Sequence, residues 1–468
     1  MQFVNKNIAV LGLGLETIDL IHWLKQNSQN SPITVFDQKT KEDLQLELSQ
    51  IKSLLDSKTF KNFNFSLGKK YLQLDLTDFD IIFRSPGFYR LHPAIIKAEK
   101  KNIPVSSSIK LFFQLCPCPI IGVTGTKGKG TTTALIHKIL QSSNKSSYLA
   151  GNIGKSPLQL LSKLTKKDIV CLELSSFQLQ DINQSPHIAV VLNITKEHLD
   201  VHKNTSEYRQ AKTNILNFQT KKDYAVLNAD YSFSASLKNK TPASIFFFSR
   251  QKPVKGSYVD NNKIYLNFNK PILIGSTDKL LLRGQHNWEN ITAAITASAL
   301  AGADITAIQQ ATFSFKGLEH RLELVRIVNR ISFYNDSFST TPETTIAAIK
   351  SFTQPMIIIL GGSDKGSDYT QLGKTITSSQ NIKAVILIGD MTEKIHQAIN
   401  QANSFKGKII KNLKNMQQIV NQAFALSAKG DAIILSPACA SFDMFKNYKD
   451  RGNQFKQASA YAQISPPI

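Results

Sequence analysis

Residues 122–133, with the sequence GVTGTKGKGTTT, combine glycines, lysines and threonines in an order that suits the binding of a phosphate chain. Glycines let backbone N–H groups curl around phosphate oxygens, and the start of a helix adds a favourable dipole. An apolar segment typical of the end of a buried strand precedes this stretch, and a helical pattern at 134–140 follows it. We therefore predict that Lys129 binds the β- and γ-phosphates of a nucleoside triphosphate and that Thr131 or Thr132 holds Mg²⁺.

The glycine-rich stretch matches a shorter variant of the P-loop pattern, G-T-K-G-K-x-T, which begins at Gly125. The general pattern asks for glycine at 123, where this chain has Val123, and for serine or threonine at 130, where it has Gly130. A flexible basic turn is the alternative, but a strand and a helix stand where phosphate binding needs them. The predicted ATP-binding residues here are Gly125, Thr126, Lys127, Gly128, Lys129, Gly130, Thr131 and Thr132.

Further side chains stand where a parallel sheet places catalytic or metal-binding groups, although each reads as structural when taken alone. Glu173 lies near the end of an apolar strand predicted at 168–176, and His198 comes just beyond the next one. Lys212 borders the apolar face of a predicted helix that also contains Tyr208. By itself Lys212 reads as a solvated lysine.

A second candidate phosphate site lies near the N-terminus. A Gly-Leu-Gly turn at 12–14 follows a predicted strand, and Asp37 ends the next strand. The pattern is similar to a dinucleotide fingerprint, but Thr17 replaces its third glycine. An NAD-dependent oxidoreductase and a site for another phosphate-bearing nucleotide both remain open. Arg84 and Ser85, which follow another predicted strand, are expected at the same edge of the sheet.

Repeated strand–turn–helix patterns predict an α/β protein with three domains. Residues 1–113 would form a Rossmann-like domain, 114–315 a central P-loop domain, and 316–468 a second Rossmann-like domain. Strands are predicted at 8–11, 33–37, 80–84, 168–176, 190–194, 224–227, 263–266, 332–334, 356–360, 384–388 and 432–435, and helices at 17–24, 134–140 and 291–301.

The composition is that of an ordinary globular protein. Of 468 residues, 42% are hydrophobic and 19% charged, and no apolar run approaches the length needed to cross a bilayer, so we expect no membrane insertion. The net charge of +22 is large, but the lysines are scattered, which favours polyanionic small substrates over nucleic acid. A non-catalytic nucleotide-binding or nucleic-acid-binding protein remains an alternative.

The four cysteines, Cys116, Cys118, Cys171 and Cys439, match neither a zinc-binding nor a C-x-x-C spacing. Reduced thiols are typical of the cytoplasm, where structural disulfides are rare. We therefore expect a cytoplasmic protein.

Longer motifs resemble those of the Mur ligases, the ATP-dependent amino-acid ligases of peptidoglycan synthesis, over nearly the whole chain. These motifs are GTKGK at 125–129, GNIG at 151–154, ELSSF at 173–177, NITKEHLD at 193–200, YRQAK at 208–212, HNWEN at 286–290, HRLE at 320–323 and NDS at 335–337. The tract LSPACASFDMFKNY at 435–448, followed by Arg451 and Gly452, is most similar to the members that add D-glutamate to UDP-N-acetylmuramoyl-L-alanine. The Asp-Asn-Pro-Arg motif of the members that add the diamino acid is absent.

The resemblance implies that the first domain holds the UDP group, the central domain ATP and Mg²⁺, and the third domain the incoming glutamate. The UDP-substrate residues would be Leu15, Glu16, Thr17, Asp37, Arg84, Ser85 and Asn152. ATP binding would add Asn287 and Asn290 at the adenine and Arg321 and Asp336 at the ribose and phosphates. The implied metal ligands are Thr131, Glu173, His198 and a carbamylated Lys212, and the glutamate-binding candidates are Lys365, Ser441 and Tyr448.

In the implied reaction, ATP phosphorylates the alanyl carboxylate, and the amine of glutamate attacks the resulting acyl phosphate. The chain departs from the family at Phe338, where a lysine is common. The acceptor therefore stays open between D- and L-glutamate, and a related ligase with another acceptor or a folylpolyglutamate-type ligase remains an alternative. We expect a monomer.

Overall fold

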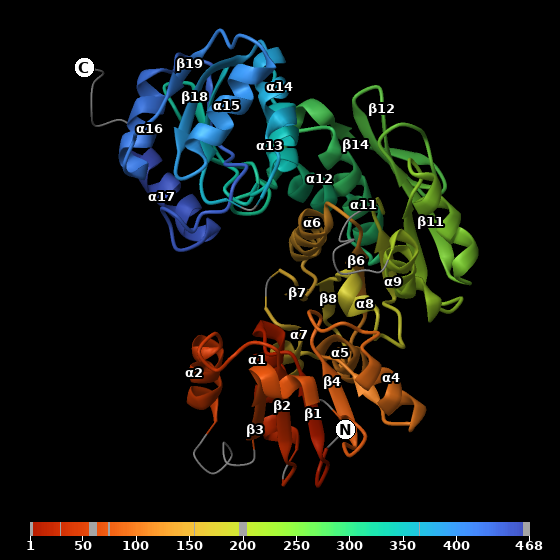
Figure 1. Cartoon of the computed structure of the whole chain (residues 1–468). Helices are drawn as coiled ribbons and strands as arrows, with labels where there is room; N and C mark the ends of the chain where they lie inside the picture. The colour runs from red at the N-terminus through yellow and green to blue at the C-terminus, as the bar shows by residue number, and fades with distance from the viewer. Residues whose placement is uncertain are drawn as a thin grey trace. The chain divides into compact units, whose positions relative to one another are not determined.

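The computed structural model of the chain describes residues 3–28, 30–55, 63–73, 75–153, 155–195, 204–364 and 366–461. These residues form an α/β protein, as the sequence predicts, and their strands make sheets of five, nine and six strands (Figure 1). The chain divides into two compact units. One comprises residues 1–278 and 289–312, and the other comprises 279–288 and 313–468.

The first sheet is parallel, with its strands in the order β3-β2-β1-β4-β5. The strands are β1 (Ile8–Leu11), β2 (Ile33–Asp37), β3 (Phe63–Leu67), β4 (Ile81–Arg84) and β5 (Val105–Ser106), and the helices are α1 (Leu15–Asn27), α2 (Gln45–Leu54), α4 (Pro93–Lys100) and α5 (Ser108–Leu115). The strand order reverses between β1 and β4. Open parallel sheets bind ligands beyond the carboxyl ends of the strands at such a point.

The second sheet has the order β14-β13-β12-β11-β10-β9-β6-β8-β7 and is parallel from β7 to β12. Its strands are β6 (Ile120–Thr124), β7 (Ser147–Gly151), β8 (Ile169–Glu173), β9 (Ile188–Val191), β10 (Tyr224–Asn228), β11 (Ser244–Ser249), β12 (Gly256–Asp260), β13 (Lys263–Asn267) and β14 (Pro271–Ser276). The accompanying helices are α6 (Lys129–Ser142), α7 (Pro157–Leu160), α8 (Ser176–Leu179), α9 (Thr205–Asn217), α10 (Ser232–Ser236), α11 (His286–Leu300) and α12 (Ile305–Ser314). The P-loop strand β6 lies inside the parallel part, between β9 and β8.

The third sheet has the order β15-β16-β20-β17-β18-β19, with only β15 antiparallel to its neighbour among the described strands. Its strands are β15 (Glu323–Val328), β16 (Ile331–Asn335), β17 (Met356–Gly361), β18 (Ile382–Ile388), β19 (Lys408–Ile410) and β20 (Ala432–Leu435), and its helices are α13 (Pro342–Ile349), α14 (Thr370–Ser378), α15 (Thr392–Ala402), α16 (Met416–Ala425) and α17 (Tyr448–Tyr461). Alternate residues of the strands enter two separate cores, with Phe333 and Ile357 in one and Tyr334 and Ile358 in the other. This alternation places helices over both faces of the sheet.

The first and second sheets share one hydrophobic core. Val10 of β1 and Val170 of β8 belong to the same cluster of buried side chains, which also contains Phe112 of α5 and Leu158 of α7. This shared core explains why the first two predicted domains fall within one compact unit. The division into three domains at 113 and 315 stays a prediction.

Element ends differ from the sequence prediction where the chain turns toward the P-loop. The strand predicted at 190–194 is β9 and ends at Val191, because the Asn193 carbonyl turns to accept the N–H of Thr126 at 2.7 Å. The helix predicted from residue 134 begins five positions earlier, at Lys129, and so includes the lysine that is predicted to bind phosphate. Among the helices of the described ranges, none has the length and apolar character needed to span a membrane.

Candidate active site

The predicted P-loop joins the end of β6 to the start of α6 and adopts a conformation that requires glycine. Gly128 has a φ of 88°, in the left-handed region that glycine adopts without strain. A Cβ atom at this position would also overlap the side-chain oxygen of Asn290 in α11. The loop is thus packed closely against α11, and a larger residue at 128 would disturb both segments.

Hydrogen bonds to the segment after β9 fix the middle of the loop. The N–H of Thr126 donates to the Asn193 carbonyl at 2.7 Å, and the Thr126 hydroxyl accepts the N–H of Thr195 at 2.9 Å. The same hydroxyl lies 3.1 Å from the Tyr208 hydroxyl of α9. Residues far apart in the sequence therefore fix the conformation of the loop. The sequence did not predict these contacts of Thr126.

Two lysines converge on the carbonyl of Gly125. Lys129 Nζ donates to it at 2.9 Å and also to the Thr126 carbonyl at 3.0 Å. Lys212 Nζ, from α9, donates to the same Gly125 oxygen at 2.8 Å and lies 4.8 Å from the centre of the Tyr208 ring. Lys212 is only 2% exposed, so the interpretation of this residue as a solvated lysine is wrong. The structure brings two cationic groups to the phosphate-binding loop.

Glu173 ends β8 beside the P-loop strand. It pairs with Val123 of β6 on one side and with Gly151 of β7 on the other, and it is buried. A Cβ atom at Gly151 would overlap the backbone oxygen of Glu173, so glycine is required for this close approach. Glu173 therefore lies on the strand directly adjacent to the one that leads into the P-loop.

The donor set near the loop fits Mg²⁺ better than a softer metal. Carboxylate and hydroxyl oxygens are ligands that Mg²⁺ prefers, and it commonly takes one or two carboxylates together with substrate phosphates. Thr131 is partly exposed in the first turn of α6, whereas Thr132 is fully buried and its hydroxyl lies 3.4 Å from Asn290 Oδ1. Thr131 is thus the better candidate of the two predicted hydroxyls. The described residues contain no cluster of three His, Cys, Asp or Glu side chains, and His198 lies outside them.

The predicted adenine residues both belong to the start of α11. Asn290 is buried, with Oδ1 near Thr132 and against Gly128, so it contacts the P-loop and the helix that follows it. Asn287 is also buried and donates from Nδ2 to the Arg283 carbonyl at 2.7 Å. Their contact with adenine stays a prediction.

In the second unit, Asp336 is held tightly at the end of β16. Its carboxylate accepts the N–H of Leu322 at 3.0 Å and the hydroxyl of Ser436 at 2.7 Å. Burial raises the pKa of Asp336 to about 6. The guanidinium carbon of Arg321 lies 3.9 Å from the centre of the Phe338 ring. A cationic group thus lies beside Phe338, the position at which the family commonly has a lysine.

Arg451 joins the loop after β16 to the loop after β20, which contains the glutamate-binding candidate Ser441, and the sequence interpretation gave it no role. It is fully buried, and its guanidinium group donates to the Ser337 hydroxyl at 3.0 Å, the Ser337 carbonyl at 2.9 Å, and the carbonyls of Cys439 and Ala440. These bonds join the loop after β16 to the loop after β20. Ser441 is buried in the second of these loops, Tyr448 begins α17, and Lys365 lies outside the described residues.

The Gly-Leu-Gly turn of the first sheet is closed by its own side chains. Asp37 accepts the N–H of Leu13 at 2.7 Å, and the Thr17 hydroxyl donates to the Gly12 carbonyl at 2.7 Å. Gly12 has a φ of 84°, and a Cβ atom there would overlap the hydroxyl of Ser85. Asp37 and Ser85 therefore shape this turn. The Asp37 carboxylate accepts a hydrogen bond from the backbone, which argues against its binding the ribose of a dinucleotide.

Two other predicted UDP-substrate residues lie on different segments. Glu16 in the first turn of α1 accepts a hydrogen bond from Gln178 Nε2 at 2.6 Å, and burial raises its pKa to about 7. Asn152 is exposed in the loop after β7. Leu15 begins α1, but its side chain lies outside the described part of the structure.

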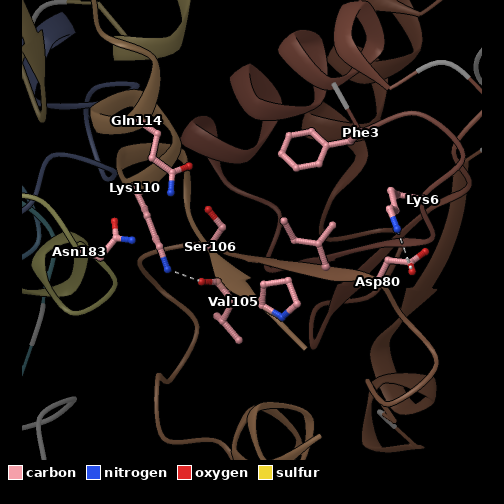
Figure 2. Close-up of a pocket in the computed structure, with 10 residues that line it drawn as sticks. Phe3, Lys6, Asp80, Val105, Ser106, Lys110, Gln114 and Asn183 are labelled. Carbon is pink, nitrogen blue, oxygen red and sulfur yellow. Dashed lines mark hydrogen bonds and ion pairs between the residues drawn. The ribbon is translucent and has the colours of Figure 1, made fainter. Parts of the chain in front are cut away.

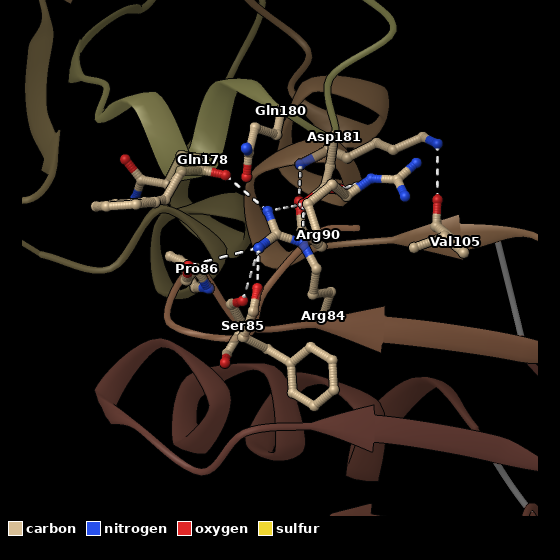
Figure 3. Close-up of polar contacts among 12 residues, drawn as sticks. Arg84, Ser85, Pro86, Arg90, Val105, Gln178, Gln180 and Asp181 are labelled. Atoms are coloured by element: carbon tan, nitrogen blue, oxygen red, sulfur yellow. Dashed lines mark hydrogen bonds and ion pairs between the residues drawn. The ribbon is translucent and has the colours of Figure 1, made fainter. Parts of the chain in front are cut away.

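Arg84 is buried and has protein partners on every side of its guanidinium group (Figure 3). Nε and Nη2 donate to Asp181 Oδ2 at 2.9 and 2.6 Å, Nη2 also donates to the Phe177 carbonyl, and Nη1 donates to the Phe88 carbonyl at 2.5 Å. Arg90 Nε lies 3.1 Å from the other Asp181 oxygen. This geometry argues against the predicted contact between Arg84 and UDP. Arg84 instead links the turn after β4 to the segment after α8.

A cavity of about 480 Å³ lies at the opposite end of the first sheet (Figure 2). Its lining includes Phe3, Lys6 and Asp80, which precede β1 and β4, together with Val105 and Lys110. Lys110 Nζ donates to the Val105 carbonyl at 2.8 Å, and Lys6 Nζ lies 3.5 Å from Asp80. The predicted substrate residues are absent from this lining, so the cavity is separate from the candidate site.

The matches to family models cover the P-loop and most of the third sheet. The Mur ligase middle domain matches residues 123–298, and the Mur ligase glutamate ligase domain matches 320–439. The chain belongs to the Mur ligase family. It is 38% identical over 459 residues to a protein of Acetivibrio thermocellus named UDP-N-acetylmuramoylalanine--D-glutamate ligase, covering 97% of this chain and 96% of that protein. A protein of Ruminiclostridium cellulolyticum with the same name is 39% identical, with the same coverage.

Solved structures of the family share the fold. A UDP-N-acetylmuramate-alanine ligase of Thermotoga maritima aligns with a TM-score of 0.57 at 15% identity, covering 98% of this chain and all of that one. A pseudomurein peptide ligase type C of Methanothermus fervidus aligns with a TM-score of 0.55 at 17% identity, covering 97% of this chain. At these identities the likeness concerns the fold alone.

Proposed function

We propose that the chain is an ATP-dependent ligase that joins D-glutamate to UDP-N-acetylmuramoyl-L-alanine in peptidoglycan precursor synthesis. The observation that carries this proposal is the convergence of Lys129 and Lys212 on the Gly125 carbonyl of the P-loop. Lys129 supplies a cation at the loop, and Lys212 supplies the amine for the carbamate proposed below. A cation suits a reaction in which a phosphoryl group passes between two anions, because that transfer depends mainly on positioning and charge neutralisation. The choice of substrates is supported by the names of the relatives that match along the whole chain.

The first step activates the alanyl carboxylate, which is otherwise a poor acyl donor because its leaving group would be oxide. A carboxylate oxygen attacks the γ-phosphorus of ATP, the bond to the β-phosphate oxygen breaks, and ADP leaves. Lys129 and the loop N–H groups hold the phosphates in line for this attack. Glu173 and Thr131 would hold Mg²⁺, which supplies charge neutralisation at the phosphates when it is bound.

The second step forms the amide. The amine of glutamate attacks the acyl carbon and loses a proton, and inorganic phosphate leaves from the tetrahedral intermediate. We place glutamate at the carboxyl edge of the third sheet, near Ser441 and Tyr448, with Arg451 holding the loops in position. Lys365 remains a further candidate for binding glutamate. The guanidinium group of Arg321, stacked on Phe338, supplies a positive charge for a glutamate carboxylate in place of the lysine common in the family.

We place the UDP group beyond the carboxyl ends of β1 and β4, near Glu16, Thr17, Asp37 and Ser85. The reversal of strand order between β1 and β4 at this edge supports this site. We further propose that His198 completes the metal site and that Lys212 reacts with CO₂ to form a carbamate, releasing a proton. A cytoplasmic monomer of three domains, with Rossmann-like first and third domains, fits this function.

The test is phosphate release by purified protein with ATP, Mg²⁺ and UDP-N-acetylmuramoyl-L-alanine, measured with each candidate amino acid in turn. We expect turnover with D-glutamate and none with L-glutamate. Turnover with L-glutamate alone would establish the alternative acceptor. Protein that binds ATP but releases no phosphate with D-glutamate would refute the proposed function.

A further inference from the structure

Cys116 and Cys118 form a close pair of thiols in the short connection between α5 and β6. Their Sγ atoms lie 3.6 Å apart, and Cys116 Sγ lies 3.4 Å from the Cys118 carbonyl oxygen. Both cysteines are free, and each is followed by a proline, which fixes φ and limits the number of shapes this connection adopts. The proximity of the two sulfurs is therefore a property of a stiff segment.

The two thiols differ in access and acidity. Cys116 is partly exposed, whereas Cys118 is 9% exposed. The hydrogen bond from the Cys118 thiol lowers the pKa of Cys116, and the same bond together with burial raises the pKa of Cys118. Since the thiolate is the reactive form, Cys116 is suited to attack and Cys118 to resolve the product.

The remaining cysteines lack this arrangement. Cys171 lies within β8 and Cys439 in the loop after β20, and both are buried. Among the described residues, no third His, Cys, Asp or Glu side chain joins Cys116 and Cys118 in a group that could hold a metal ion. A pair of thiols without a third ligand favours disulfide chemistry over a structural zinc site, which needs four ligands.

We propose that Cys116 and Cys118 are a dithiol modification site that reacts with small disulfides to form an intramolecular disulfide. The Cys116 thiolate attacks one sulfur of the small disulfide, forms a mixed disulfide and releases one thiolate. Cys118 then loses its proton and attacks Cys116 Sγ, and the second thiolate leaves. Two protein thiols are oxidised, and one small disulfide is reduced to two thiols.

The position of the pair gives this oxidation a structural effect. A disulfide bond is about 2.05 Å long, so the sulfurs must move closer than their present 3.6 Å separation. Cys118 stands two residues before Ile120, the first residue of β6, which runs into the P-loop. Oxidation would therefore alter the segment that joins the first sheet to the strand leading into the P-loop.

The experiment counts thiols in the intact chain and is independent of ligase activity. Reduced protein is freed of reductant, incubated with glutathione disulfide at neutral pH, then denatured, alkylated and weighed by mass spectrometry. We expect the wild type to lose two of its four alkylatable thiols without gaining glutathione, and dithiothreitol to restore all four. Prior treatment with phenylarsine oxide, which bridges paired thiols, should give one phenylarsenic adduct in the mass spectrum in place of the disulfide.

Matched variants assign the steps. Cys118→Ser should stop at one glutathione attached to Cys116, Cys116→Ser should keep all its thiols, and Cys171→Ala should still lose two. Wild-type protein that retains four alkylatable thiols would overturn the proposal, as would a wild-type mixed disulfide that persists. Because both of these readings come from the wild type, the test stands even if a variant folds poorly.

Discussion

Replacement of Asp181 by asparagine tests whether the buried link between the first and second sheets contributes to stability. Asp181 accepts two hydrogen bonds from Arg84 through one oxygen, while Arg90 lies at the other. The side chains of Arg84 and Asp181 are each 1% exposed. Asparagine keeps the shape of aspartate but removes its charge, so Asp181→Asn leaves a buried guanidinium group without its counter-ion.

Removing one partner of a buried ion pair costs about 3–5 kcal/mol of folding free energy. Arg84 keeps the carbonyls of Phe88 and Phe177, so we expect the lower end of this range. At about 2–4 °C per kcal/mol for domains of 150–250 residues, a loss of about 3 kcal/mol lowers Tm by roughly 6–12 °C. The compact unit that contains Asp181 is larger than about 250 residues, so we expect a decrease in Tm of about 6 °C.

The assay is thermal unfolding followed by circular dichroism, with urea unfolding as a second measurement. Asp75→Asn is the matched control, because Asp75 pairs with Lys97 in the same unit but the two side chains are 51% and 58% exposed. Exposed pairs contribute little, so this control should barely change Tm. Equal shifts in Asp181→Asn and Asp75→Asn would refute the assignment of Arg84 and Asp181 as a stabilising link.

Other predictions concern the nucleotide site and the pH response. Lys129→Ala should abolish ATP-dependent product formation, because the phosphates lose their main cation. Retained product in a coupled phosphate assay would contradict this. Lys212→Ala should be inactive but partly rescued by short carboxylates, and full unaided activity would remove the carbamate proposal. Burial raises the pKa of Glu16 to about 7, so the folded state holds this proton more tightly than the unfolded state. Glu16 therefore favours folding at low pH, and that contribution is lost as pH rises from about 4.5 to 7. Glu16→Gln should become more stable relative to the wild type between pH 5 and pH 8, whereas parallel urea midpoints would contradict the assignment.

The sequence predicted the features that depend on neighbouring residues. The strand–turn–helix around Lys129 and the carboxylate at the end of β8 follow local patterns, and the structure contains both. The parallel sheets also follow from alternating strand and helix patterns. Such features are predictable because backbone conformation and hydrophobic periodicity act over short distances along the chain.

Features that depend on distant partners were not predictable in this way. Lys212 reads as solvated by itself, yet it reaches a carbonyl 87 positions earlier in the chain. Arg84 suits a phosphate by chemistry, but its partner Asp181 is 97 positions away and occupies it. Arg451 was missed because its bonds are mostly to backbone carbonyls, which have no signature in side-chain type.

The segment from Glu173 to Asp181 contacts both sheets of the first unit. Its first residue stands beside the P-loop strand, and farther along Gln178 bonds to Glu16 and Asp181 to Arg84. A capping box at Ser175 holds the intervening turn of helix rigid. A displacement at the carboxyl edge of the first sheet would therefore be transmitted through this short segment to the Glu173 carboxylate, so that the two proposed substrate sites are mechanically connected.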